Sequence, residues 1–116
     1  MAKIAAIEAG GTKFICGIGN EKGEIFEKIS IPTTVPEETM KKVIEYFKEK
    51  EFEAMGIGSF GPIDPVKSSE TYGYISKTPK PHWGDYNIVG ELKKNFNVPM
   101  EFDTDVNGAA LGESLW

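Results

Sequence analysis

The chain has 116 residues, of which 40% are hydrophobic and 27% are charged, and its formal net charge is −5. These values are typical of one folded domain or part of one, and they exclude a chain that is disordered throughout. All 13 basic residues are lysine, so the chain has no arginine guanidinium group that could bind a phosphate or a guanine base through two parallel hydrogen bonds. The net negative charge excludes a nucleic-acid-binding surface.

Two further features of the composition concern the setting of the protein. No apolar run approaches the roughly 20 residues that cross a bilayer, and the first residues lack the apolar core of a secretory signal. The single cysteine, Cys16, cannot form an internal disulfide, and with one histidine, His82, it cannot build a zinc cluster. We therefore expect a cytoplasmic protein with no membrane partner.

Three runs at the start of the chain predict an antiparallel meander. Residues 3–8 are mostly apolar, as in a buried strand, and residues 13–19 and 24–31 alternate in the strand period. Turn sequences at 9–12 and 20–23 separate the runs. In the second run the alternation places Cys16 in the core.

A change of period after residue 31 predicts a helix. Thr34 and Glu37 have the spacing of a capping box, with Pro36 in the first helical turn. The apolar stripe of this helix recurs at helical spacing and comprises Met40, Val43, Ile44 and Phe47. Residues 54–59 then predict a second buried strand.

The remainder of the chain begins with a long loop over residues 62–84, which is rich in proline and contains a short strand around 71–76. A loop of this length in a compact domain is usually functional. A helix over 85–96, a strand over 100–103 and a third helix from Val106 follow. The last helix reaches Trp116 without a stop signal, so we expect the chain to be a fragment of a longer protein.

Strand–helix–strand crossovers require parallel neighbours, so this order predicts a mixed five-stranded sheet with flanking helices. The fold class is α/β, and the layout resembles the half-domain of the ribonuclease-H-like, or actin-like ATPase, fold.

Residues 10–13, Gly-Gly-Thr-Lys, form the first candidate site, at the tip between the first two strands. Backbone N–H groups of a Gly-Gly turn can cradle phosphate oxygens, to which Thr12 adds a hydroxyl and Lys13 a charge. The spacing is not that of a P-loop. The other interpretation is a plain hairpin turn in which glycine supplies positive φ.

Acidic residues at strand ends form the second candidate site. Asp105 follows the strand over 100–103, where it can accept a proton from a substrate hydroxyl or, alternatively, cap the next helix. Glu8 ends the first strand, where its carboxylate can hold Mg²⁺ through water or simply face solvent.

The loops over 56–64 and 78–83 lie at strand ends. The second combines polar groups with an aromatic face, a mixture suited to a sugar, although a proline-stiffened surface loop fits the composition as well. His82 has no visible partner in the sequence.

Three motifs taken together resemble the ROK family of sugar kinases: IEAGGTKF at 7–14, GIGSFGPID at 56–64 and DTDVNGAALGE at 103–113. The first motif and TPKPHW at 78–83 resemble most its bacterial fructokinase branch. The resemblance covers nearly the whole chain.

The resemblance implies ATP-dependent phosphorylation of a hexose, fructose in this branch, with ATP and Mg²⁺ as cofactors. It implies that Asp105 is the catalytic base, that Glu8 is the metal residue and that Thr104, where glucose-specific relatives carry Asn, argues against a strict glucokinase. The nucleotide phosphates would be held by Gly10, Gly11, Thr12 and Lys13. The sugar would be bound by Gly61, Thr78, Lys80 and Thr104.

Relatives carry a second lobe with an adenosine pocket and a zinc site, so residues 1–116 are expected to form an N-terminal lobe that is inactive alone. The intact protein is expected to be a homodimer. Two alternatives remain. One is a non-catalytic, sugar-sensing ROK regulator, although we expect no DNA-binding module before the first strand, because Met1 leads directly into it. The other is a half-domain that acts by association.

Overall fold

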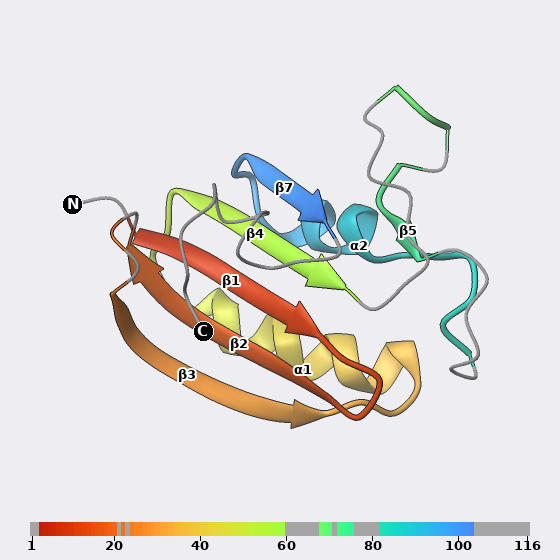
Figure 1. The fold of residues 1–116 in the computed structure, drawn as a ribbon, viewed down its shortest axis with the longest axis horizontal. Coiled ribbons are helices and arrows are strands. Elements are labelled where there is room, and N and C mark those ends of the chain that lie inside the picture. Colours follow the sequence, from red (N-terminus) through yellow and green to blue (C-terminus); the bar gives the residue numbers. More distant parts are fainter. Residues whose placement is uncertain are drawn as a thin grey trace.

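A mixed five-stranded sheet forms the centre of the computed structural model, which describes residues 3–20, 22, 24–59, 68–70, 72–75 and 82–103. The strand order is β3-β2-β1-β4-β7 (Figure 1). The five strands are β1 (Lys3–Ala9), β2 (Lys13–Asn20), β3 (Ile25–Pro32), β4 (Ala54–Ser59) and β7 (Met100–Asp103). β2 is antiparallel to β1 and β3, whereas β4 is parallel to β1 and β7. The predicted meander and mixed sheet are therefore confirmed.

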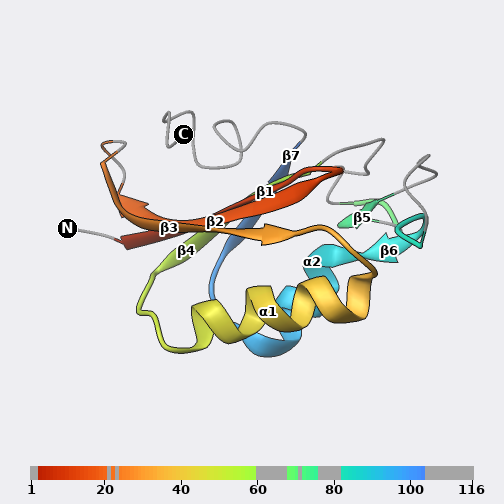
Figure 2. The ribbon, with the colours of Figure 1, turned by 90° about the horizontal axis from the view of Figure 1, so that it is seen from below.

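Two helices, α1 (Pro36–Lys48) and α2 (Ile88–Asn95), cover one face of this sheet (Figure 2). The predicted stripe of α1 is confirmed, because Met40, Val43 and Phe47 are buried and Ile44 packs against the same core. Aliphatic, methionine and aromatic side chains of the sheet and of the helices form one core cluster between the two layers. Within the described residues, neither helix is long and apolar enough to cross a membrane.

The predicted capping box of α1 is wrong. Helix α1 begins at Pro36, one residue later than the box requires, and its N-cap Val35 makes no side-chain cap. The hydroxyl of Thr34 donates to Glu38 Oε1 at 2.9 Å, and the amide N–H of Thr34 donates to Thr39 Oγ1 at 2.8 Å. The side chain of Thr39, in the first part of the helix, therefore holds the chain that enters α1. Pro36 occupies the first helical position, where a backbone N–H would have no partner within the helix.

Helix α2 is shorter than the predicted 85–96. Asp85 has φ +60, a left-handed conformation that does not occur within a right-handed α-helix. Tyr86–Asn87 (β6) pairs with Tyr74–Ile75 (β5) in a separate two-stranded sheet. β5 confirms the predicted short strand, whereas β6 was not predicted.

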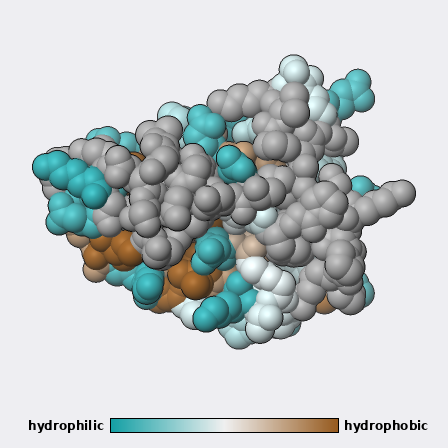
Figure 3. Space-filling view, in the orientation of Figure 1, coloured by the Kyte–Doolittle hydropathy of each residue, from teal (hydrophilic) through white to brown (hydrophobic). Residues whose placement is uncertain are grey.

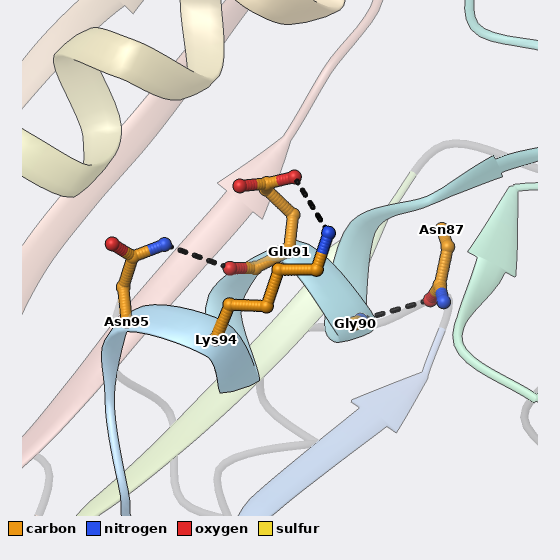
Figure 4. A network of polar contacts seen from close by, with 5 residues as sticks. All are labelled: Asn87, Gly90, Glu91, Lys94 and Asn95. Atoms are coloured by element: carbon orange, nitrogen blue, oxygen red, sulfur yellow. Dashed lines mark hydrogen bonds and ion pairs between the residues drawn. The ribbon is translucent and has the colours of Figure 1, made fainter.

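The start of α2 is fixed by a side-chain cap (Figure 4). Asn87 Oδ1 accepts a hydrogen bond from the Gly90 N–H at 2.8 Å, as expected of an asparagine N-cap. Further along the helix, Lys94 pairs with Glu91 at 3.9 Å and Asn95 Nδ2 donates to the Glu91 carbonyl at 3.0 Å (Figure 4). Lysine in the last turn also complements the helix dipole.

β3 is one of the two edge strands of the main sheet, and Ile31 is its one buried residue. Ile25, Phe26 and Ile29 are exposed, and Figure 3 shows hydrophobic surface on the side of the molecule where β3 lies. Glu27 ties the strand to α1, because its Oε1 accepts from the Tyr46 hydroxyl at 2.8 Å and pairs with Lys50 at 2.8 Å. Both hydrogen bonds lower the pKa of Glu27, and the one from Lys50 has the larger effect.

Candidate functional site

The site is built where three parallel strands end. The carboxyl ends of β1, β4 and β7 meet at one edge of the sheet, toward the right in Figure 1. Open α/β sheets bind ligands beyond this edge, because loops leave the strands there and their polar groups converge.

The pairing register places a row of four residues across the sheet next to this edge. Glu8 lies between Ile15 of β2 and Gly58 of β4, and Gly58 lies beside Asp103 of β7. Since side chains alternate along a strand, Glu8 faces away from its core neighbour Ile7 and thus away from the helices. The glycine in the row leaves open space next to the Glu8 carboxylate.

Residues 10–13, here named the glycine turn, connect β1 to β2 as predicted. The Gly10 N–H donates to the Lys13 carbonyl at 3.0 Å, which closes the turn. A Cβ at Gly10 would lie 2.8 Å from that carbonyl oxygen, so no other residue fits without a shift. Neither glycine has a positive φ. The interpretation that these glycines supply a positive φ was therefore wrong. Glycine at position 10 instead allows the Lys13 carbonyl to lie close to the Gly10 backbone.

The middle of the glycine turn is open to solvent. Gly11, Thr12 and Lys13 are exposed, and a Cβ at Gly11 would meet nothing within 4 Å. In the described part of the chain, the N–H groups of Gly11 and Thr12 donate to no protein acceptor. Such free backbone donors are what an anion such as phosphate requires.

The glycine turn and the strand ends enclose a hollow of about 380 Å³. It is lined by Glu8, Ala9, Gly10, Gly11, Thr12, Lys13, Ile15, Gly58 and Ser59. The ammonium group of Lys13 and the free N–H groups favour a phosphate chain, whereas the carboxylate of Glu8 favours a hard cation. The structure therefore brings together five predicted residues, the four of the glycine turn and Glu8.

The other predicted site residues lie outside the described residues: Gly61, Thr78, Lys80, Thr104 and Asp105. The helix predicted from Val106 lies there too. The described chain reaches Asp103, beside Gly58 of the hollow. That Asp105 and the glycine turn share a crevice stays a prediction.

Trp83 was predicted as part of an exposed sugar platform or surface loop, and both predictions are wrong for this residue. Its side chain is 0% exposed. Its ring centroid lies 5.4 Å from that of Phe14 and 5.3 Å from that of Tyr86, and its Nε1 donates to the Thr34 carbonyl at 2.7 Å. The neighbouring His82 is exposed and has φ +73. A large aromatic residue in a loop gains much free energy from burial, and that was the one available signal.

Cys16 is buried, as predicted, and takes no part in the hollow. Burial raises the pKa of its thiol to about 12. The thiol therefore stays protonated and unreactive near neutral pH.

The two glycines of the turn give a matched test of structural and ligand roles. We expect Gly10→Ala to lower the free energy of unfolding by about 1–3 kcal/mol, because the added methyl group meets backbone at 2.8 Å. Gly11→Ala should change the free energy of unfolding by less than about 0.5 kcal/mol, since a Cβ at Gly11 meets no other atom within 4 Å. The same substitution should weaken nucleotide binding, because Gly11 lines the hollow. Urea unfolding and ADP titration of both variants check this. Equal stability of the two variants would contradict it.

Comparison with known proteins adds the family context. A family model described as the ROK family matches residues 4–116. A fructokinase from Pediococcus pentosaceus is 54% identical over 97% of this chain and 39% of its own length. A fructokinase from Streptococcus mutans is 49% identical over 99% of this chain and 40% of its own length. The chain thus spans about two fifths of these curated relatives.

A solved structure has the same fold. The crystal structure of a ROK family glucokinase from Streptomyces griseus in complex with glucose and AMPPNP matches with a TM-score of 0.74, at 21% identity, over 93% of this chain and 35% of that one. The likeness confirms the predicted actin-like α/β fold.

Proposed function

The chain belongs to the ROK family, and from that premise we propose that the intact protein is an ATP-dependent kinase that phosphorylates a hexose, with fructose as its substrate. The observation that carries the proposal is the 54% identity to a fructokinase over 97% of the chain. The geometry supports it, because an open turn with free N–H donors and a lysine lines a hollow beside a carboxylate. A sugar-sensing regulator is not favoured, since the two relatives that are 54% and 49% identical to the chain are named fructokinases.

Each part of the site has a role in this proposal. Asp105 accepts the proton of the attacking sugar hydroxyl, which makes its oxygen a better nucleophile toward the γ-phosphoryl group. The N–H groups of the glycine turn and the Lys13 ammonium hold the phosphate chain and stabilise the charge that develops during transfer. Closure around the bound sugar excludes water and limits hydrolysis of ATP.

The donor set of the hollow fits Mg²⁺. This ion favours oxygen ligands, keeps several waters and is bound by one or two carboxylates plus phosphate oxygens. Glu8, whose carboxylate is exposed and lines the hollow, supplies one such ligand. When bound, the ion offsets phosphate charge. Within the described residues no group of three His, Cys, Asp or Glu side chains could hold a metal, so we assign zinc to the second lobe.

The sugar is proposed to be bound by Gly61, Thr78, Lys80 and Thr104. Threonine at 104 in place of asparagine argues against a strict glucokinase. Residues 1–116 form the N-terminal lobe in this proposal, and the second lobe, in a cytoplasmic homodimer, supplies the adenosine pocket and further sugar contacts.

The test is a coupled kinase assay on the full-length protein with MgATP and a panel of hexoses. We expect fructose to be phosphorylated with a kcat/KM at least about tenfold above that for glucose, because a site built for one set of hydroxyls discriminates strongly. Phosphorylation of glucose alone would contradict the substrate, and no phosphorylation of any hexose would contradict the reaction. A gel shift with DNA tests the regulator.

A further inference from the structure

Thr33 supports the glycine turn from the side away from the hollow. It directly follows β3, whose end lies beside the turn (Figure 1), and it is 8% exposed. Its amide N–H donates to the Thr12 carbonyl at 3.0 Å and its hydroxyl donates to the Gly10 carbonyl at 2.7 Å. One residue therefore pairs two of the carbonyl oxygens of the turn, and it does not line the hollow.

These two hydrogen bonds set the direction of the peptide groups in the turn. A trans peptide is planar, and its C=O and N–H point in opposite directions. Because the Gly10 carbonyl points to Thr33, the N–H of Gly11 points away from Thr33. In the same way, the pairing of the Thr12 carbonyl fixes the peptide group between Thr12 and Lys13. Gly11, whose N–H donates to no acceptor among the described residues, lines the hollow.

The direction matters for an anion. A carbonyl oxygen carries partial negative charge and repels phosphate, whereas an N–H attracts it. If the peptide between Gly10 and Gly11 rotated, the hollow would lose a donor and gain an acceptor. The Thr33 hydroxyl opposes this rotation, because it would leave a carbonyl and a hydroxyl without partners in a mostly buried place.

The anchor of Thr33 is itself fixed. At the next residue, the Thr34 N–H donates to Thr39 Oγ1 at 2.8 Å, and the Thr34 carbonyl accepts from Trp83 Nε1 at 2.7 Å. The main chain at 33–34 is thereby held by α1 and by the buried tryptophan. A rigid support of this kind positions a binding group better than a free loop does.

We propose that Thr33 is a positioning residue of the phosphate site: its hydroxyl holds the Gly10 carbonyl away from the hollow, so that the glycine turn presents N–H donors to the phosphate chain of ATP. The inference deepens the proposed function and rests on it for the identity of the nucleotide. It assigns Thr33 to nucleotide binding and not to contact with the sugar.

The test compares Thr33→Val with Thr33→Ser in the full-length protein. Valine keeps the shape and the backbone N–H but removes the hydroxyl, so we expect KM for ATP to rise about tenfold or more. Serine keeps the hydroxyl, and KM should stay within about twofold of the wild type. KM for fructose should change by less than about twofold in both variants, because the hydroxyl acts on the phosphate side alone.

Asn20→Ala is the structural control. Asn20 is also buried, and its Oδ1 accepts from the N–H groups of Lys22 and Glu24 at 2.9 and 3.1 Å, at the end of β2 that lies away from the glycine turn. We expect it to lower thermal stability while leaving KM for ATP within about twofold of the wild type. If Thr33→Val raises KM for ATP no more than Asn20→Ala does, the role of Thr33 is structural only and the inference is overturned.

Titration calorimetry with MgADP separates this inference from the proposed reaction. If the wild type phosphorylates no hexose, the proposed function fails, but weaker MgADP binding by Thr33→Val alone still supports the inference. Equal binding by the wild type and the variants, or no binding by the wild type, overturns it.

Discussion

Asp105→Asn in the full-length protein is expected to lower kcat by a factor of about 10²–10⁴, which is the range that a positioned general base contributes. Asparagine has the same shape and can still accept a hydrogen bond from the sugar hydroxyl, but it cannot take up the proton. KM for fructose should therefore change by less than about threefold. Steady-state kinetics with varied fructose at saturating MgATP measure both constants.

The control for this variant is Asp85→Asn. Asp85 is exposed and has φ +60, a conformation that asparagine also adopts readily, and it lies outside the hollow. We expect its kcat to equal that of the wild type. If Asp105→Asn keeps more than about a tenth of the wild-type kcat, another group takes the proton and the assignment of the base is wrong.

Trp83→Ala is expected to lower the free energy of unfolding by about 3–5 kcal/mol, the usual range for removal of a large buried aromatic side chain. The change removes ring contacts with Phe14 and Tyr86 and leaves the Thr34 carbonyl without its donor. Trp83→Phe keeps a ring but loses the N–H, so it should cost about 1–3 kcal/mol. Urea unfolding of the full-length protein, followed by circular dichroism, measures both.

Phe26→Ala is the matched aromatic control for Trp83. Phe26 is 50% exposed on the edge strand, so its removal should change stability by less than about 0.5 kcal/mol. A Trp83→Ala variant that unfolds at the same urea concentration as Phe26→Ala would contradict the structural role of the tryptophan.

The sequence predicted the strands of the main sheet and the apolar stripe of α1 because their signals are local. Alternation in β2, the apolar run of β1 and the stripe of α1 each lie within a few consecutive residues. The place of Glu8 beside the glycine turn followed from the end of one strand. The start of α1 was missed by one residue, since Thr34 satisfies the pattern of a cap while Pro36 decides where the helix begins.

The parts that escaped prediction depend on contacts between distant residues. The hydrogen bond from Trp83 to Thr34 joins residues 49 positions apart, and that from Thr33 to Gly10 joins residues 23 apart. No local period carries such pairs. The reason for glycine at position 10 also appeared only in three dimensions, because a Cβ at this position would lie 2.8 Å from the Lys13 carbonyl oxygen.

The burial of Cys16 has a practical consequence. It is the only thiol in these 116 residues, and the thiolate, not the thiol, reacts with alkylating reagents. With its side chain 0% exposed and its pKa raised to about 12, the folded state reacts slowly for two separate reasons. The rate of alkylation therefore reports how often β2 separates from α1, without any introduced label.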